Sequence, residues 1–108
     1  MDEKDINRLL LQYEHLLRQA NKENINPKIE ELTIEGLQPL IRLIARSRAR
    51  YLEYVYELSK EYEDKEDYPT ADELKKLKTL RMRFEELAAG SAAFETSIQR
   101  GYLDLKLS

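Results

Sequence analysis

Four arginines stand close together in the stretch RLIARSRAR: Arg42, Arg46, Arg48 and Arg50, in a chain whose formal net charge is −3. Guanidinium groups bind phosphates and carboxylates through paired hydrogen bonds, so the cluster could contact nucleic acid or an acidic protein surface. Arg42, Arg46 and Arg50 share one helical face because they are four residues apart. The simpler interpretation, a solvated face or ion pairs with acidic residues of the first helix, is favoured because charge runs on helices are usually solvated.

Arg48 differs from the other three because the residues three and four positions away on the same face are apolar. A guanidinium buried there requires an acceptor. The small residues at positions 88–93 could leave a notch beside it, and an anion or a partner carboxylate in that notch is the most specific site hypothesis. The favoured alternative is close helix packing, with the Arg48 side chain reaching outwards.

Catalytic and metal-binding patterns are absent from the sequence. The chain has one histidine, His15, and no cysteine. No Glu-x-x-His or His-x-x-x-His spacing, glycine-rich phosphate loop or nucleophile arrangement can be assembled. The sequence therefore predicts a protein that is not an enzyme, with no catalytic residue, no metal and no cofactor.

The length and composition predict one helical domain, residues 1–108. A chain of 108 residues with 42% hydrophobic and 36% charged residues, but only 3 glycines and 3 prolines, is typical of a folded helical protein. We expect a first helix over about 3–21, a loop over 22–33 with a short turn through KIEEL, a second helix over about 34–66, a third over about 71–100, and a tail over 101–108. Thr70 and Glu73 have the spacing of a capping box at the start of the third helix.

Apolar residues recur at three- and four-residue spacing in all three helices, which favours an all-α, antiparallel three-helix bundle built on a long helical hairpin. Charges support the hairpin, because the second helix turns from basic to acidic along its length and the third does the same. With the turn near residue 68, Glu53 would face Arg83 and Arg50 would face Glu86. The tail alternates like a short strand, but no strand partner is evident.

The first helix is too short to cover the hairpin, at about 30 Å against about 45 Å for each of the other two. Monomers seldom expose a large apolar surface, so we expect a homodimer or a partner protein. The candidate oligomer interface consists of Tyr54, Val55, Leu58, Tyr62, Leu74, Leu77 and Leu80. Tyr56, on the outer face, is a candidate partner contact because tyrosine and arginine dominate interface hot spots.

These patterns predict a protein-interaction or assembly module that binds a partner protein or itself through an apolar, tyrosine-rich helical surface. The alternative is a subunit of a nucleoprotein complex that contacts the nucleic-acid backbone through Arg42, Arg46, Arg50 and Arg100. The balance of 18 basic and 21 acidic residues makes nucleic acid the less favoured partner. No signal peptide or long apolar run is present, so we expect a cytoplasmic protein without membrane contact.

Overall fold

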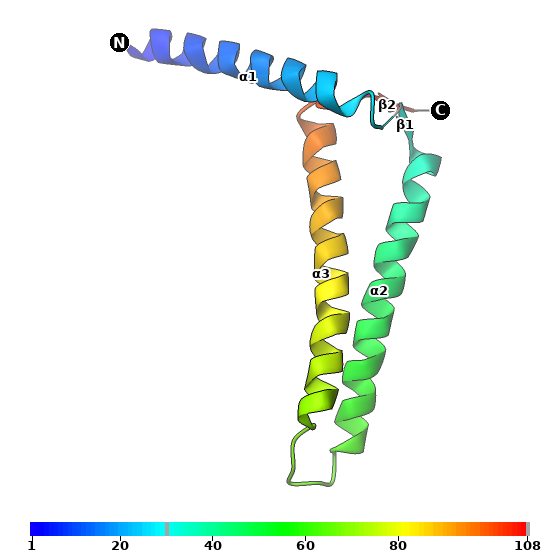
Figure 1. Ribbon diagram of the computed structural model, residues 1–108. Helices are drawn as coiled ribbons and strands as arrows, with labels where there is room; N and C mark the ends of the chain where they lie inside the picture. The colour runs from blue at the N-terminus through cyan, green and yellow to red at the C-terminus, as the bar shows by residue number, and fades with distance from the viewer. Residues whose placement is uncertain (30, 108) are drawn as a thin grey trace. The chain divides into compact units, whose positions relative to one another are not determined.

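The computed structural model describes residues 1–29 and 31–107. Three helices contain about three quarters of these residues: α1 (Glu3–Ile25), α2 (Ile34–Glu61) and α3 (Ala71–Gln99) (Figure 1). Two short strands, β1 (Leu32–Thr33) and β2 (Leu105–Lys106), complete the secondary structure. The all-α class is thereby confirmed, whereas the three-helix bundle and the dimer remain predictions.

The chain divides into two compact units, and each has its own contacts. The end unit comprises Met1–Leu37 and Ala93–Ser108, and the hairpin unit comprises Gln38–Ala92. The end unit therefore holds α1, both strands and the last turns of α3, while the hairpin unit holds most of α2 and α3.

α1 begins at Asp2, whose carboxylate accepts a hydrogen bond of 2.9 Å from the Asp5 amide. This cap satisfies one of the free N–H groups at the start of the helix. The helix continues to Ile25, four residues beyond the expected end, because the first residue unable to donate to the preceding turn is Pro27. No α1 residue is buried.

The tail pairs with the loop before α2. β2 runs parallel to β1, with Leu32 opposite Leu105 and Thr33 opposite Lys106. The expectation that the tail lacks a strand partner is therefore wrong. A two-residue strand inside a loop has no periodicity that would reveal it in the sequence. The turn expected through KIEEL includes Glu30, which lies outside the described residues.

α3 begins and ends with well-formed caps. At its start, the Thr70 amide donates to Glu73 Oε1 at 2.9 Å and the Glu73 amide donates to Thr70 Oγ1 at 3.1 Å, which confirms the predicted capping box. At its end, Gly101 takes a φ of 71° and the Tyr102 amide donates to the Ser97 carbonyl. This left-handed ending satisfies carbonyls that the helix leaves free.

In the hairpin unit, α2 and α3 lie side by side and run in opposite directions (Figure 1). Their contact line buries Ile44, Leu58 and Leu80, and the rings of Tyr51 and Phe84 stack with centroids 6.3 Å apart. α2 ends at Glu61, before the expected residue 66. The acidic residues that follow oppose further helix, because carboxylates are unfavourable at the negative end of the helix dipole.

No helix in the described part of the chain is both long enough and apolar enough to cross a membrane.

Candidate interaction surfaces

One flank of the hairpin unit is apolar and open to solvent. We call it the apolar hairpin face; it consists of Ile41, Leu52 and Val55 of α2 and Leu74 and Leu77 of α3. Ile41, Leu52 and Leu74 are 58%, 56% and 49% exposed. A shallow hollow of about 470 Å³ is lined by Val55 of α2 and Leu77 of α3, so the apolar flanks of the two helices meet.

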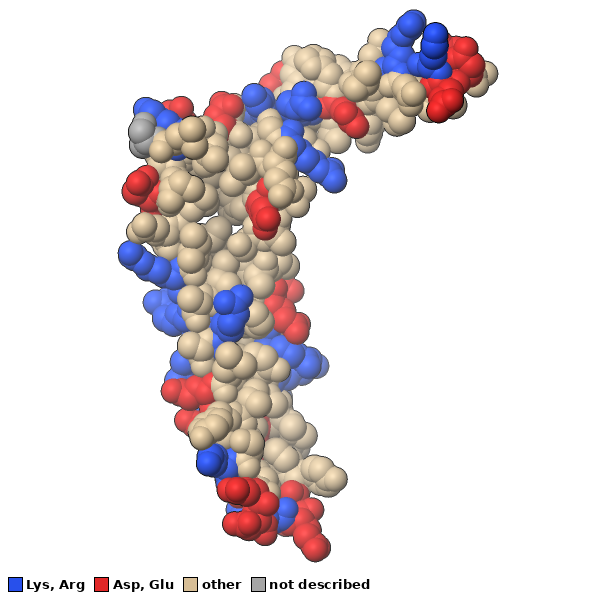
Figure 2. Space-filling view, turned by 180° about the vertical axis from the view of Figure 1, so that it is seen from behind, with Lys and Arg blue, Asp and Glu red and all other residues tan. Residues whose placement is uncertain are grey.

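The geometry of two packed helices explains why this face is exposed. A helix buries only the side chains along its line of contact, and in α2 that line runs through Ile44, Tyr51 and Leu58. Leu52 and Val55 lie to one side of this line, where only a third layer could cover them. Figure 2 shows uncharged surface along both helices of the hairpin, bordered and interrupted by basic and acidic side chains.

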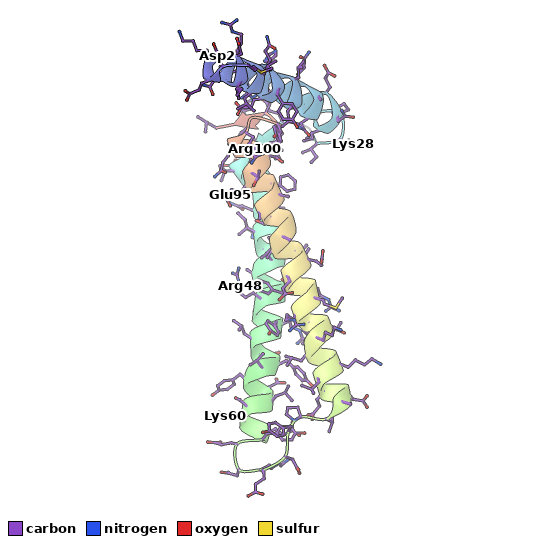
Figure 3. All side chains as sticks on the ribbon, turned by 90° about the vertical axis from the view of Figure 1, so that its left-hand side faces the viewer. Asp2, Lys28, Arg48, Lys60, Glu95 and Arg100 are labelled. Atoms are coloured by element: carbon purple, nitrogen blue, oxygen red, sulfur yellow. The ribbon has the colours of Figure 1, made fainter. Side chains whose placement is uncertain are left out.

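Arg48 lies within the apolar hairpin face and contacts an aromatic ring. Its guanidinium carbon is 5.0 Å from the centroid of the Phe84 ring, and the side chain is exposed (Figure 3). This is a cation–π contact, which needs no carboxylate. Arg48 therefore places an exposed positive charge beside the apolar side chains, where it contacts the Phe84 ring.

The opposite flank of α2 is charged. Arg42 donates to Gln38 Oε1 at 3.1 Å, and Arg50 forms an ion pair with Glu53 at 3.2 Å. For Arg46, the described residues provide neither a hydrogen bond nor an ion pair. We call this flank the charged hairpin face; it consists of Arg42, Arg46, Arg50, Glu53 and Glu57, which share a side of α2 because they are three or four residues apart.

The ion pairs within the described part of the hairpin unit lie inside single helices. Arg50 bonds to Glu53, and Arg81 bonds to Glu85 at 3.8 Å. The predicted ion pairs between helices, Glu53 with Arg83 and Arg50 with Glu86, are not found among the described residues. A charged side chain three or four residues away on the same helix is nearer than one on the neighbouring helix. Two cations contact an aromatic ring of the other helix: Arg48 lies over Phe84, and the Lys76 ammonium lies 4.5 Å from the centroid of the Tyr54 ring.

A hydrogen bond fastens the tip of the hairpin. The Tyr62 hydroxyl at the end of α2 donates to Glu73 Oε1 in the first turn of α3. This bond raises the pKa of Tyr62 to about 12, with a smaller contribution from desolvation. The same bond, together with the Thr70 amide, lowers the pKa of Glu73. Glu73 thus links the two helices as well as capping one of them.

The predicted oligomer-interface residues fall into three environments. Leu58 and Leu80 are buried between α2 and α3; Tyr54, Tyr62 and Leu77 are partly buried; Val55 and Leu74 are exposed. The predicted partner contact Tyr56 is 63% exposed, and the Lys60 ammonium lies 5.4 Å from its ring centroid.

The end unit has an apolar surface of its own on α1. The sequence predicts that these side chains pack inside a three-helix bundle. We call this surface the α1 stripe; it consists of Ile6, Leu9, Leu10, Tyr13 and Leu16. Their exposed fractions are 47%, 50%, 53%, 62% and 63%, in the same order. The three- and four-residue spacing identifies an apolar helix side but does not say what covers it.

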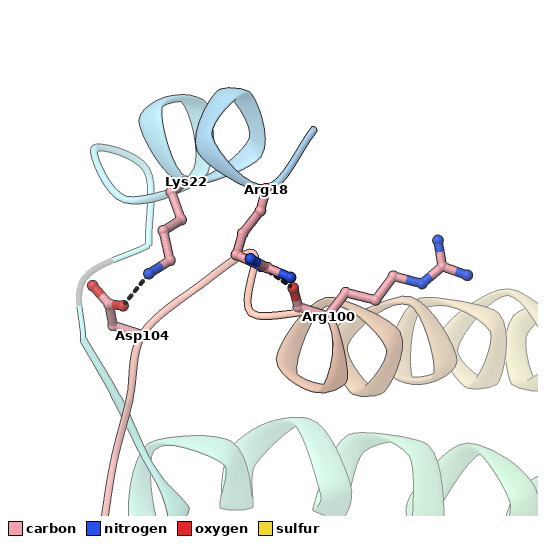
Figure 4. Close-up of polar contacts among 4 residues, drawn as sticks. All are labelled: Arg18, Lys22, Arg100 and Asp104. Carbon is pink, nitrogen blue, oxygen red and sulfur yellow. Dashed lines mark hydrogen bonds and ion pairs between the residues drawn. The ribbon is translucent and has the colours of Figure 1, made fainter. Parts of the chain in front are cut away.

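Two polar contacts hold the C-terminal half of α1 on the residues that follow α3 (Figure 4). Arg18 Nε donates to the Arg100 carbonyl at 3.1 Å, and Lys22 Nζ lies 3.4 Å from Asp104 Oδ1. The Arg18 side chain also lies beside Gly101, where an added Cβ would be in ordinary van der Waals contact with it at 3.4 Å. We call these contacts the α1 anchor.

Arg100, a candidate phosphate contact, has neighbours within the end unit. It shares a hollow of about 470 Å³ with Tyr102 and Glu14. Hydrogen bonding to Tyr102 raises the pKa of Arg100, and the Glu14 carboxylate adds to this effect. The nearby carboxylate weakens the attraction of Arg100 for a phosphate.

The described residues contain no group of three or more histidine, cysteine, aspartate or glutamate side chains placed to hold a metal ion. Comparison of the chain with models of protein families, with curated proteins and with solved structures gives no match. The features of the described residues that bear on function are the two apolar surfaces and the charges around them.

Proposed function

We infer that this protein is a non-enzymatic interaction module that binds protein through the apolar hairpin face. The observation that carries the proposal is the exposure of Ile41, Leu52, Val55 and Leu74 on one side of a helix pair. Contiguous apolar surface on a soluble protein commonly marks a binding site. Covering one half-exposed leucine contributes about 1 kcal/mol, at about 25 cal/mol per Å² of apolar area.

The small core of the hairpin unit supports the same proposal. Within Gln38–Ala92 the buried apolar side chains are Ile44, Leu58 and Leu80. Small domains bury proportionally less surface than large ones and have little stability to spare. A protein cover would extend this core across the apolar hairpin face.

The residues around the face have the chemistry of an interface. Arg48 and Tyr62 lie beside the apolar side chains, and Tyr56 is exposed on the same helix. Arginine and aromatic residues are enriched at the energetic centres of protein interfaces. The antiparallel three-helix bundle within one chain stays a prediction.

Affinity capture with matched variants tests the proposal. Leu52→Glu places a carboxylate on the apolar hairpin face, whereas Met82→Glu places one on the outer side of α3, two residues from the buried Leu80. Both side chains are more than half exposed, so neither change should unfold the hairpin. We expect the wild type and Met82→Glu to retain a common binding protein and Leu52→Glu to lose it. Equal capture by all three proteins would contradict the proposal.

The nucleic-acid alternative finds less support on the charged hairpin face. Arg50 is paired with Glu53, and Glu57 continues the same side of α2, so a phosphate backbone there would meet carboxylates. Binding to nucleic acid stays a prediction, with a steep loss of affinity on adding salt as its signature.

A further inference from the structure

We propose that the apolar hairpin face is covered by the α1 stripe of a second copy of this chain, and that two copies exchange their α1 helices reciprocally. This inference rests on the proposed function and narrows it to one partner. In this arrangement the α1 stripe, which belongs to the end unit, packs on the apolar hairpin face, which belongs to the hairpin unit, and each surface covers the other.

The two surfaces are alike in kind, and the α1 stripe is short enough to fit along the apolar hairpin face. The α1 stripe runs from Ile6 to Leu16, about 15 Å along its helix, and the apolar hairpin face runs from Ile41 to Val55, about 21 Å along α2. The α1 stripe consists of isoleucine, leucine and tyrosine side chains and the apolar hairpin face of isoleucine, leucine and valine, and all of them except Leu77 are exposed. A third helix on a helical hairpin packs through such a stripe.

The charges on the two surfaces are complementary. Helical spacing places Asp5 on one border of the α1 stripe and Glu14, which lies beside Arg100 of its own unit, on the other, while Lys4, Arg8 and Lys22 fall on the opposite side of α1. The apolar hairpin face contains Arg48, whose neighbour is the Phe84 ring. An apolar helix with acidic borders would therefore meet a cation on docking.

The α1 anchor leaves the α1 stripe available for docking on a second copy. Arg18 and Lys22 hold α1 against Arg100 and Asp104, just beyond the end of α3. The α1 stripe precedes this anchor in the sequence and is left exposed within its own unit. Docking on another copy covers the stripe and keeps both anchoring contacts, and a two-fold arrangement forms the same interface twice.

Photo-crosslinking in a mixture of isotope-labelled and unlabelled chains tests this exchange. Leu10 is replaced by p-benzoylphenylalanine in both chains, the two are mixed, and the crosslinked peptides are mapped by mass spectrometry. We expect crosslinks from position 10 to positions 41–59 of α2 or 74–84 of α3, with labelled peptides joined to unlabelled ones. Crosslinks within single copies only, or between two α1 helices, would overturn the proposal, as would a chain that gives no crosslink.

Matched variants test the same contact from both sides. Leu10→Glu and Leu52→Glu should each raise the dissociation constant of the dimer about a hundredfold, since each disrupts two symmetric contacts. Leu11→Glu and Met82→Glu should leave it unchanged, because Leu11, 67% exposed, lies on the side of α1 opposite the stripe. Circular dichroism checks that all four variants keep their helices. Equal effects of Leu10→Glu and Leu11→Glu would contradict the exchange.

Failure of this inference is distinguishable from failure of the proposed function. If a different protein covers the apolar hairpin face, Leu52→Glu abolishes its capture while Leu10→Glu does not, and the wild type gives no mixed-isotope crosslinks. That result overturns the exchange between copies and leaves the interaction module standing.

Discussion

At the scale of single residues, the best-defined feature is the contact between Tyr62 and Glu73. Glu73 accepts hydrogen bonds from the Tyr62 hydroxyl and from the Thr70 amide, so one carboxylate fastens the hairpin tip and caps α3. The capping role follows from the sequence, because Thr70 and Glu73 have the required spacing. The bond to Tyr62 does not, because it depends on the length of the loop and on where α2 ends.

This contact makes the stability of the hairpin depend on pH at the alkaline end. The pKa of Tyr62 is raised from 10 to about 12 in the folded state, so its contribution is fully present below pH 10 and is lost as the pH rises through 12. We expect the free energy of unfolding to fall between pH 10 and 12 more steeply in the wild type than in Tyr62→Phe. Urea titrations at a series of pH values measure this difference.

Tyr56→Phe is the matched control for that experiment, because Tyr56 is 63% exposed and its hydroxyl makes no hydrogen bond with a carboxylate in the described residues. It should keep the wild-type slope. At the acidic end the pKa of Glu73 is lowered, so its contribution holds above about pH 4.5 and disappears as the pH falls through the lowered value. If the free energy of unfolding falls with the same slope between pH 10 and 12 in the wild type and in Tyr62→Phe, the bond between Tyr62 and Glu73 does not have this role.

At the scale of helices and strands, the sequence predicts the starts better than the ends. Thr70 caps α3 as its spacing from Glu73 predicts, and Asp2 caps α1 at the predicted start of the first helix. The end of α2 depends on the balance between an apolar pattern, which continues to Tyr62, and a run of carboxylates that opposes the helix dipole. The pairing of β1 with β2 joins residues more than seventy positions apart, so no local pattern could reveal it.

Gly90, within α3, and Gly101, just after its end, give a prediction at this scale. Gly101→Ala should destabilise the protein by about 1 kcal/mol or more, because Gly101 has a φ of 71°, which alanine adopts only with strain. Gly90→Ala should instead stabilise it by about 0.5–1 kcal/mol, because Gly90 is helical with open space around its Cα. Thermal unfolding of the two variants measures both effects, and a loss of stability of the same size in both would contradict the account.

At the scale of the whole molecule, composition and periodicity predict three helices and a helical hairpin, and both are present. They do not decide which surface covers which, because an apolar stripe has the same spacing whether it packs inside one chain or against another. Leu58 and Val55 illustrate this: both belong to the predicted interface, yet Leu58 is buried between α2 and α3 while Val55 is 39% exposed. The four arginines of RLIARSRAR are divided in the same way, with Arg48 on the apolar hairpin face and the other three on the charged one.

The mass of the protein in solution shows whether a second copy covers the apolar hairpin face. Light scattering over a range of micromolar concentrations should give the wild type and Met82→Glu twice the chain mass of 12.8 kDa, and Leu52→Glu a single chain mass. A wild type that stays at 12.8 kDa at every concentration, or three proteins with the same mass, would contradict the account.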